Sequence, residues 1–377
     1  MNPLLWKVNW GLVLFTAFAL VVLVQLYYHW WFFRRIAFFK PSQRSRSQTH
    51  PVSVIVCARD EAANLVKNLP GVLVQSYPTT HEIIVVNDNS VDESKYVIEE
   101  LQKSFRNLQH VQLKQEAKGI PGKKYPLSIG IKEAKHEIVL LTDADCVPAT
   151  EHWIQKMQDA YDDGIEVVLG YGAYHKKAGM LNRLIRFETF QSALQYLSFA
   201  LAGIPYMGVG RNLSYKKGLF FKVKGFSSLN HVPSGDDDLF INKVAHRANT
   251  AVVIDKEATI LSEPKKTFGD WFRQKTRHFS TARYYRPIHK FLLGLYTSSQ
   301  FLFYPLFISA VLLFDWRMVL AVFLVRMISF FSIYSRALKQ LDENDLSGWL
   351  LVLDVWQFFY YLIFAPALWK KPRPTWN

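Results

Sequence analysis

Two aspartates that directly follow an apolar run are the residues best suited to chemistry in this chain. Asp143 and Asp145 are separated only by Ala144, and the run Ile138–Thr142 before them predicts a buried strand. A strand that ends in Asp-x-Asp places carboxylates at the carboxyl edge of a sheet, where open α/β sheets bind ligands. Carboxylates at this spacing suit a hard cation, Mg²⁺ or Mn²⁺, and such a cation suits a diphosphate. Taken alone, the motif favours a ligand-free polar turn over a metal site.

Further charged residues follow two other apolar runs, which points to a shared site. The predicted strands cover Val52–Ala58, Glu82–Val86, Val111–Lys114 and Ile138–Thr142, and the predicted helices cover Asp60–Gln75, Val91–Phe105, Lys123–Ala134 and Glu151–Tyr161. This alternation is typical of an α/β fold with a mostly parallel, doubly wound sheet and helices on both faces. Since parallel strands end at one edge, we expect Arg59, Asp88 and the Asp143–Asp145 pair to meet there.

Two polar clusters and a basic helix follow in the second half of the chain. The clusters are Gly208–Asn212 and the run Asp236-Asp237-Asp238, whose carboxylates repel one another and must face solvent, a cation or hydrogen-bond donors. The segment Thr267–Lys290 predicts one amphipathic helix at a membrane surface, in which Gln274, Arg277 and His278 share a face. A purely electrostatic membrane anchor is the alternative for this helix. For the earlier helix predicted over Leu181–Leu201, core packing and membrane-surface contact both stay open.

Apolar residues are concentrated at the two ends of the chain, which predicts a membrane protein. The run Gly11–Phe33 carries no charge and is longer than the ~20 residues that span a bilayer. The basic residues that follow place the middle of the chain in the cytoplasm by the positive-inside rule. Three further candidate spans cover Phe291–Phe314, Met318–Tyr334 and Trp349–Leu368. Four spans would put the basic tail outside, so we expect one of these three to be re-entrant or interfacial.

Charge and cysteine content narrow the possible partners. The net charge of +14 favours an anionic membrane face or a phosphorylated substrate. The sequence contains no zinc-finger spacing or nucleic-acid module, so we expect no nucleic-acid partner. The two cysteines, Cys57 and Cys146, form no CxxC motif and are expected to be reduced packing residues. Arg326 and Asp354 fall within the spans, where charges usually face a cavity or a partner helix.

Between about Pro51 and His278 the chain resembles the membrane-bound family 2 glycosyltransferases of the GT-A fold. This group includes ceramide glucosyltransferase and the cellulose and hyaluronan synthases. The resemblance rests on motifs in a fixed order: VIVCARDEAANL, VVNDNSVDES, GKKYPLSIGI, the DxD of Asp143 and Asp145, GVGRN, GDDDL and QKTRH. Such an ordered set is specific, whereas each motif alone is weak.

The resemblance implies a role for each of these residues. It places the donor nucleotide sugar against Ala58, Arg59, Glu61, Asp88, Lys123, Asp143 and Gln274, and the acceptor against Gly210, Arg211, Asn212 and His278. It implies a metal held mainly by Asp145, with Asp143. It assigns the catalytic base to Asp237, with Asp236 as the alternative register, and positive charge on the leaving group to Arg277. His278 stands where the family has tryptophan, which puts the role of that ring, and a polymer channel, in doubt.

The resemblance and the composition together predict an inverting, metal-dependent transfer of a sugar from a nucleoside diphosphate sugar, expected to be a UDP-sugar, to a lipid or lipid-linked acceptor. The expected parts are an N-terminal transmembrane helix (1–35), a basic linker (36–51), a cytosolic GT-A domain (52–266), an interface helix (267–290) and a C-terminal transmembrane region (291–377). We expect a bacterial cytoplasmic-membrane protein. The alternatives are a processive polysaccharide synthase, a non-catalytic nucleotide-sugar scaffold and a small transporter.

Overall fold

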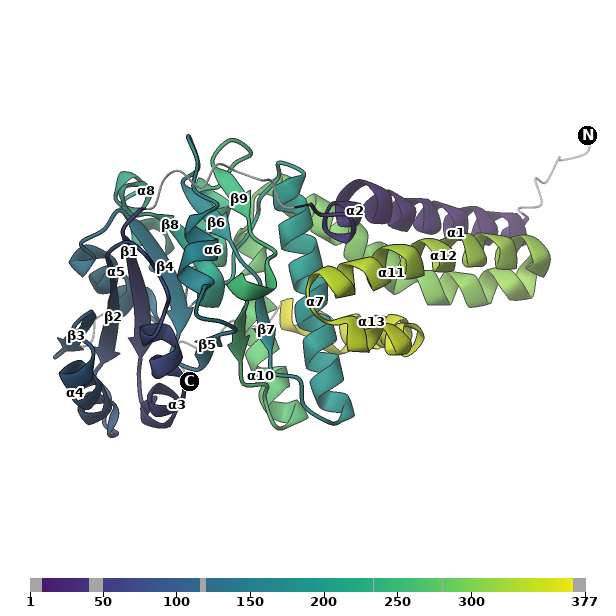
Figure 1. Cartoon of the computed structure of the whole chain (residues 1–377). Helices are drawn as coiled ribbons and strands as arrows, with labels where there is room; N and C mark the ends of the chain where they lie inside the picture. The colour runs from purple at the N-terminus through teal and green to yellow at the C-terminus, as the bar shows by residue number, and fades with distance from the viewer. Residues whose placement is uncertain (1–8, 41–49, 116–119, 233, 280, 369–377) are drawn as a thin grey trace, which may run out of the picture. The chain divides into compact units, whose positions relative to one another are not determined.

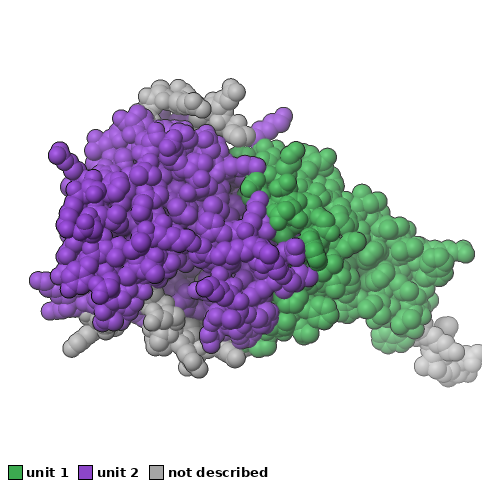
Figure 2. Space-filling model, turned by 60° about the horizontal axis from the view of Figure 1, so that its bottom comes forward, with its two compact units in different colours: residues 1–39, 286–366 green, residues 40–285, 367–377 purple. Residues whose placement is uncertain are grey.

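The computed structural model describes residues 9–40, 50–115, 120–232, 234–279 and 281–368. The chain divides into two compact units, residues 1–39 with 286–366 and residues 40–285 with 367–377, which are coloured separately in Figure 2. The larger unit contains the sheet and all the predicted site residues, and the smaller unit is helical.

A seven-stranded sheet in the order β3-β2-β1-β4-β8-β6-β9 forms the centre of the larger unit (Figure 1). The strands are β1 (Val52–Ala58), β2 (His81–Asp88), β3 (Leu108–Leu113), β4 (Ile138–Asp143), β6 (Val167–Leu169), β8 (Leu213–Lys216) and β9 (Thr250–Val252). The first four are parallel neighbours, while β8 runs antiparallel to both β4 and β6. The predicted α/β class with a mostly parallel sheet is therefore confirmed.

Helices cover both faces of this sheet, as predicted. The helices of this unit are α3 (Ala62–Leu73), α4 (Ser94–Ser104), α5 (Lys124–Glu133), α6 (Trp153–Gln158), α7 (Met180–Leu201), α8 (Lys217–Lys222), α9 (Asp238–Val244) and α10 (Phe268–Phe279). On one face Val54 and Val56 of β1 share a buried cluster with Leu65 and Leu69 of α3. On the other face α5 lies so close that a Cβ on Gly130 would meet the side chain of Ile55 at 2.7 Å.

A second, three-stranded sheet in the order β5-β10-β7 lies in the same unit. Its strands are β5 (Cys146–Pro148), β10 (Ile260–Ser262) and β7 (Gly172–Tyr174). The sequence suggested one strand over Val167–Ala173, but the structure splits it between the two sheets. Gly170 and Gly172 lie at this break, and a Cβ at either position would lie within 2.5 Å of the side chain of Asn212 or Arg211.

Other predicted boundaries also shift. β3 begins at Leu108 instead of Val111, and α6 is shorter than the predicted helix over Glu151–Tyr161. The single helix predicted over Thr267–Lys290 is wrong: α10 ends at Phe279, and a new helix begins at Pro287. Proline is favoured in the first turn of a helix because its missing N–H has no partner there anyway.

Helix α7 belongs to the core of its unit. Phe187, Phe190, Leu194 and Leu197 are each at most 1% exposed. Of the two open interpretations of this helix, core packing is therefore the one that the structure supports.

The smaller unit is a group of long apolar helices. They are α1 (Trp10–Tyr27), continued by a π-helical turn (Tyr28–Phe33) and α2 (Arg34–Ala37), then α11 (Pro287–Leu313), α12 (Trp316–Gln340) and α13 (Leu350–Phe364). Among the described residues four helical segments, Trp10–Ala37, Pro287–Leu313, Trp316–Gln340 and Asn344–Phe364, are long and apolar enough to cross a membrane.

A buried ion pair joins the helices of this unit. Arg326 of α12 donates two hydrogen bonds to the carboxylate of Asp354 of α13, at 2.6 and 2.7 Å. The guanidinium also donates to Gln25 of α1 and Gln300 of α11. Both charged residues are at most 3% exposed. The expectation that these charges face a partner helix is confirmed.

Candidate active site

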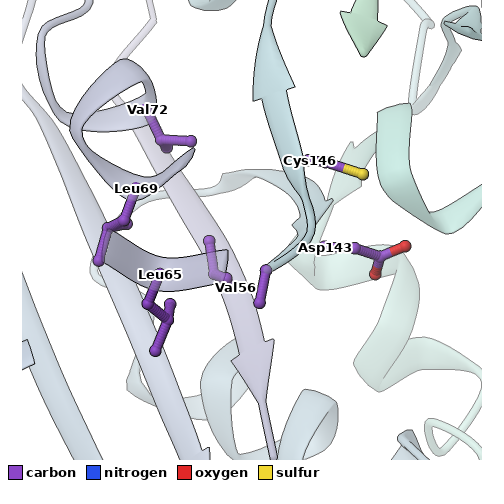
Figure 3. Close-up of a pocket in the computed structure, with 7 residues that line it drawn as sticks. Val56, Leu65, Leu69, Val72, Asp143 and Cys146 are labelled. Atoms are coloured by element: carbon purple, nitrogen blue, oxygen red, sulfur yellow. The ribbon is translucent and has the colours of Figure 1, made fainter. Parts of the chain in front are cut away.

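The DxD motif lies at the carboxyl end of β4, beside the ends of β1 and β2. In the pairing register Cys57 of β1 is opposite Asp143, and Ala58 is opposite Asn87. Behind the turn lies a narrow, mostly apolar gap lined by Val56, Leu65, Leu69, Val72, Asp143, Ala144 and Cys146. Figure 3 shows the carboxylate of Asp143 pointing away from the aliphatic side chains of α3. Apolar packing therefore backs the turn that presents the carboxylates.

Asp143 is held by Lys123, which immediately precedes α5. The Lys123 ammonium forms an ion pair with Oδ1 of Asp143. Burial acts to raise the pKa of Asp143, but Lys123, with Arg211 and Arg277, holds it below its usual value. Lys123, predicted to contact the donor, therefore pairs with the DxD motif here.

Asp145 has a different environment from Asp143. Its Oδ2 accepts a hydrogen bond of 3.4 Å from the hydroxyl of Ser262, and its Oδ1 accepts one of 3.2 Å from the thiol of Cys146. Burial and the neighbouring Asp143 raise the pKa of Asp145. The charged form of Asp145 is thus destabilised, and a cation beside it would relieve that cost.

The donor set of this turn fits a hard divalent cation. One ligand atom each from Asp143, Asp145 and Cys146 lie within 4.8 Å of one another. Burial holds the pKa of the Cys146 thiol well above its usual value, and Mg²⁺ and Mn²⁺ prefer oxygen to sulfur. The two carboxylates therefore suit such an ion, whereas the thiol does not.

The loops after β1 and β2 contribute the predicted donor-binding residues. Arg59 Nη1 lies 3.8 Å from Asp88 Oδ2. Asp60 Oδ1 accepts a hydrogen bond from the N–H of Val91, which ties the two loops together. Glu61 precedes α3 and bonds Asn64, and burial raises the pKa of its carboxyl. The structure thus brings these residues to the predicted edge of the sheet.

The three consecutive aspartates have three different environments. Asp238 Oδ2 accepts hydrogen bonds from the hydroxyls of Thr281 and Tyr285, and Asp238 is 7% exposed. Asp237 caps α9, with Oδ1 bound to the N–H of Asp238 and Oδ2 bound at 2.8 Å to the N–H of Gly210. Asp236 is partly exposed and acts electrostatically on Lys123 and Cys57. Asp238 is therefore an anchor, and Asp236 and Asp237 are the two candidates for a base.

Asp237 is held in the protonation range of a general base. Burial, followed by the negative charges of Asp236 and Asp238, raises the pKa of Asp237 to about 8. A carboxylate with a raised pKa accepts a proton more readily than an ordinary surface aspartate. The backbone N–H of Gly210 fixes this carboxylate, so Gly210, predicted to be on the acceptor side, lies beside the predicted base.

The other two residues of the predicted acceptor loop do not face outward. Asn212 is completely buried: its amide nitrogen donates to the carbonyls of Tyr171 and Ala258, and its Oδ1 accepts from Trp153. Its predicted acceptor role is therefore wrong, because all its polar contacts are internal. Arg211 lies against Tyr174 and acts electrostatically on Asp143 and Asp145, so it is on the DxD side of the site.

Helix α10 brings two further predicted residues near the acids. Gln274 Nε2 donates to the hydroxyl of Tyr174, and Arg277 acts electrostatically on Asp143. Lys275 and Glu188 of α7 form an ion pair whose side chains are 10% and 9% exposed, which fixes α10 on α7. His278 lies in α10, but its side chain is outside the described part of the structure.

Four motifs that are far apart in the sequence converge around the thiol of Cys57. Burial raises the pKa of Cys57 to about 12; Lys123 opposes this, while the charges of Asp143, Asp236 and Asp88 add to it. These residues come from four different segments of the chain. The predicted meeting of acids at one edge is thus present in the folded protein.

Two residues of this region did not stand out in the sequence. Lys124 is 1% exposed, donates to the carbonyl of Val232 and acts electrostatically on all three aspartates. Tyr174 contacts both Arg211 and Gln274. Lys124 lies within the motif GKKYPLSIGI, but the role there was given to Lys123, and Tyr174 lies in a short strand outside every motif. Only the fold therefore reveals these two residues.

Comparison with known proteins identifies the central domain. Residues 53–222 match the family model "Glycosyl transferase family 2". A probable glycosyltransferase, YdaM, of Bacillus subtilis is 26% identical over 289 residues, which cover 71% of this chain and 65% of that protein. The beta-monoglucosyldiacylglycerol synthase of Nostoc sp. is 29% identical over 101 residues, or 26% of this chain and 21% of that protein. The chain therefore spans less than two thirds of the length of these relatives.

A solved structure shares the fold over almost the whole chain. It is the mannosyltransferase PcManGT from Pyrobaculum calidifontis, in complex with GDP-Man and Mn²⁺, with a TM-score of 0.56 and 17% identity over 92% of this chain and 98% of that one. Together with the mostly parallel sheet, this similarity shows that the chain has a GT-A-like fold, whose residues 53–222 are the ones that match the family 2 glycosyltransferase model.

Proposed function

We propose that this protein transfers a sugar from a nucleoside diphosphate sugar to a hydroxyl of a lipid or lipid-linked acceptor, with inversion and with Mg²⁺ or Mn²⁺. The observation that carries the proposal is the gathering of charges at the ends of β1, β2 and β4: Asp143 lies opposite Cys57 of β1 and pairs with Lys123, and Asp88 ends the neighbouring strand β2. Asp236 adds its negative charge at the same place. Acids and a lysine gathered at the carboxyl edge of an α/β sheet fit a ligand that combines a cation with a diphosphate.

The proposed reaction exchanges one bond at the anomeric carbon. The bond from this carbon to the diphosphate oxygen breaks and its electron pair leaves with the diphosphate, while a bond to the acceptor oxygen forms on the opposite face. Asp237 takes the proton of the acceptor hydroxyl, a step typically worth about 10²–10⁴-fold in rate. Asp145, with Asp143, would hold a divalent cation, which supplies Lewis-acid neutralisation of the leaving diphosphate.

The chain's own cations complete this arrangement. The positive charge of Arg277 helps to lower the pKa of Asp143, an acid of the DxD motif. We therefore assign Arg277 to the leaving diphosphate. Arg59 and Asp88, which lie 3.8 Å apart, are assigned to the nucleoside. Lys123 is assigned to orient Asp143, because their ion pair is already formed. Preorganised charges of this kind commonly contribute several kcal/mol to transition-state stabilisation.

The apolar helices support an acceptor that is insoluble in water. Four described segments have the length and composition to cross a bilayer, and the relative from Nostoc sp. is named a beta-monoglucosyldiacylglycerol synthase. We assign the larger unit to the cytoplasmic side, because Arg34 and Arg35 follow the first apolar helix. The segment Asn344–Phe364 is the shortest of the four at 21 residues, so we assign it as the re-entrant one.

Release of nucleoside diphosphate by the purified full-length protein tests the proposal. The assay would compare UDP- and GDP-sugars, with and without Mn²⁺, in bilayers that contain extracted membrane lipids; GDP-sugars belong in the set because the PcManGT complex contains GDP-Man. We expect metal-dependent release that rises when lipid is supplied, and a lipid product of discrete mass. Asp145→Asn should abolish release, whereas the exposed control Asp163→Asn should not. No release from any donor would refute the proposal, and a long polymer would favour the processive alternative.

A further inference from the structure

Arg211 occupies a site that two residues of β7 shape for it. Its guanidinium carbon lies 4.6 Å from the centre of the Tyr174 ring, and its Nη2 donates a 2.7 Å hydrogen bond to the carbonyl of Gly172. A Cβ at Gly172 would lie 2.3 Å from Arg211 Nε and under 3 Å from its Cγ and Cδ. Only glycine at position 172 leaves room for this side chain.

The second sheet places this arginine beside the DxD motif. Ser262 of β10 is in register with Cys146 of β5 on one side and with Tyr174 of β7 on the other. Since neighbouring strands lie about 4.8 Å apart, Tyr174 is about 10 Å across the sheet from Cys146. The hydroxyl of Ser262 also bonds Asp145. The row Cys146–Ser262–Tyr174 thus runs from the acids to the stacked guanidinium.

Two polar atoms around Tyr174 are buried and have no hydrogen-bond partner among the described residues. They are Nε of Arg211 and Oε1 of Gln274, whose Nε2 donates to the Tyr174 hydroxyl. A buried donor or acceptor without a partner costs free energy, about 1–3 kcal/mol for a neutral group and more for a charged one. These two atoms lie beside the turn that suits a cation, and each is available to form a hydrogen bond with a bound ligand.

We infer that Arg211 binds the diphosphate of the donor, and that Gly172 and Tyr174 are positioning residues that hold its guanidinium beside Asp143 and Asp145. This inference rests on the proposed function and moves Arg211 from the acceptor to the donor. A guanidinium is well suited here because it binds phosphate oxygens through two parallel hydrogen bonds while it stacks on an aromatic ring.

Displacement of Arg211 should affect the affinity for the divalent cation and the affinity for the diphosphate differently. Arg211 repels a divalent cation held by Asp143 and Asp145, and it attracts the diphosphate. Displacing Arg211 should therefore leave Mn²⁺ binding unchanged or a few-fold tighter, and should weaken diphosphate binding about tenfold. General damage to the fold would weaken both, so the direction of the two changes separates positioning from structural support.

The test uses the full-length protein with Mn²⁺ alone and with inorganic pyrophosphate plus Mn²⁺, so that it does not depend on the unknown base. Gly172→Ala, Tyr174→Leu and Arg211→Met would be compared with Gly269→Ala, a helical control whose added Cβ has nothing nearer than 4.0 Å. Titration calorimetry measures pyrophosphate binding, electron paramagnetic resonance measures Mn²⁺ binding, and the melting temperature checks the fold.

We expect the three site variants to lose about tenfold in pyrophosphate affinity and to keep Mn²⁺ affinity. Gly172→Ala combined with Arg211→Met should bind no worse than Arg211→Met alone, because both changes remove one contact. Tyr174→Phe, which keeps the ring and loses the bond to Gln274, should have a smaller effect.

Unchanged pyrophosphate affinity in Gly172→Ala and Tyr174→Leu would overturn the inference, as would additive losses in the double variant or a parallel loss of Mn²⁺ binding. A wild-type protein that transfers no sugar, while these variants still weaken pyrophosphate binding, would refute the proposed function and leave the inference standing.

Discussion

At the scale of single residues, the run Asp236-Asp237-Asp238 shows how neighbouring identical side chains acquire different tasks. Asp238 binds two hydroxyls, Asp237 caps a helix, and Asp236 acts on the cations near β1. The resemblance assigned the base to Asp237, with Asp236 as the alternative register. The contact that distinguishes Asp237 from its neighbours is the one with Gly210, between positions 27 residues apart, which no local pattern encodes.

The assignment of the base predicts a specific loss of chemistry. Asp237→Asn keeps the shape and the hydrogen bond from Gly210 but cannot take a proton, so transfer should fall by about 10²-fold or more while nucleotide binding is retained. A stopped assay of sugar transfer measures the loss of turnover. Titration calorimetry with a nucleoside diphosphate measures whether nucleotide binding is retained. A variant Asp237→Asn with normal turnover, beside an inactive Asp236→Asn, would move the base to Asp236.

The raised pKa of Asp237 predicts a pH dependence. A base acts in its deprotonated form, and burial raises the pKa of this carboxyl to about 8, so turnover should rise as pH increases through this range. Below the pKa, kcat/KM should fall about tenfold per pH unit, because the deprotonated fraction falls tenfold. A profile of kcat/KM between pH 5 and 9 without an acid limb would contradict this assignment.

The anchor role of Asp238 predicts a loss of stability. Tyr285→Phe and Thr281→Val each remove a donor from a buried carboxylate, and hydrogen bonds to charged groups are worth about 1.5–3 kcal/mol. Thermal melting should show a clear drop for both variants. Tyr284→Phe, at an exposed neighbouring position, should melt like the wild type; equal melting of all three would argue against the anchor.

At the scale of elements, the strands that could be predicted were those with long apolar runs. β1, β2 and β4 are uniformly buried except at their ends, so hydrophobicity marks them in the sequence. The three-residue strands β5, β7 and β10 are too short for any periodicity, and their pairing is not local. For this reason the contacts of Arg211 with Gly172 and Tyr174 of β7 could not be predicted, although Arg211 itself was among the predicted site residues.

Helix α10 was predicted but overextended, and its attachment could not be foreseen. The pattern of Phe268–Phe279 is strongly amphipathic, which the sequence shows, but the partner of Lys275 lies in α7, 87 residues earlier. Likewise the segment after Phe279 leaves the helix and places Thr281 and Tyr285 on Asp238. These tertiary contacts override the local helical pattern.

The attachment of α10 predicts a contrast between two ion pairs in this helix. Lys275→Met leaves Glu188 buried and unpaired and should destabilise the protein by about 3–5 kcal/mol. Arg273→Met breaks an exposed pair with Asp270 and should change stability little. Denaturant titration measures both; equal effects would show that the pair of Lys275 and Glu188 does not hold α10 in place.

At the scale of the whole molecule, the chain consists of an α/β unit that contains the match to the glycosyl transferase family 2 model and a helical unit with its own charged centre. Arg326→Met or Asp354→Leu alone should destabilise this unit by about 3–5 kcal/mol, because the remaining charge stays buried. The double variant should recover most of the loss, since an apolar pair replaces the ion pair. Unfolding of the protein in detergent measures this cycle, and additive losses would contradict a direct pairing.

The central claim is that acids from distant segments hold one cation and one diphosphate at the carboxyl edge of the sheet. Anomalous diffraction from crystals grown with Mn²⁺ and a nucleoside diphosphate tests it most directly. We expect one Mn²⁺ peak, bound by a carboxylate oxygen of Asp145 and by the diphosphate, with the nucleoside beside Asp88. A Mn²⁺ peak away from Asp143 and Asp145, or a nucleotide bound elsewhere, would contradict it.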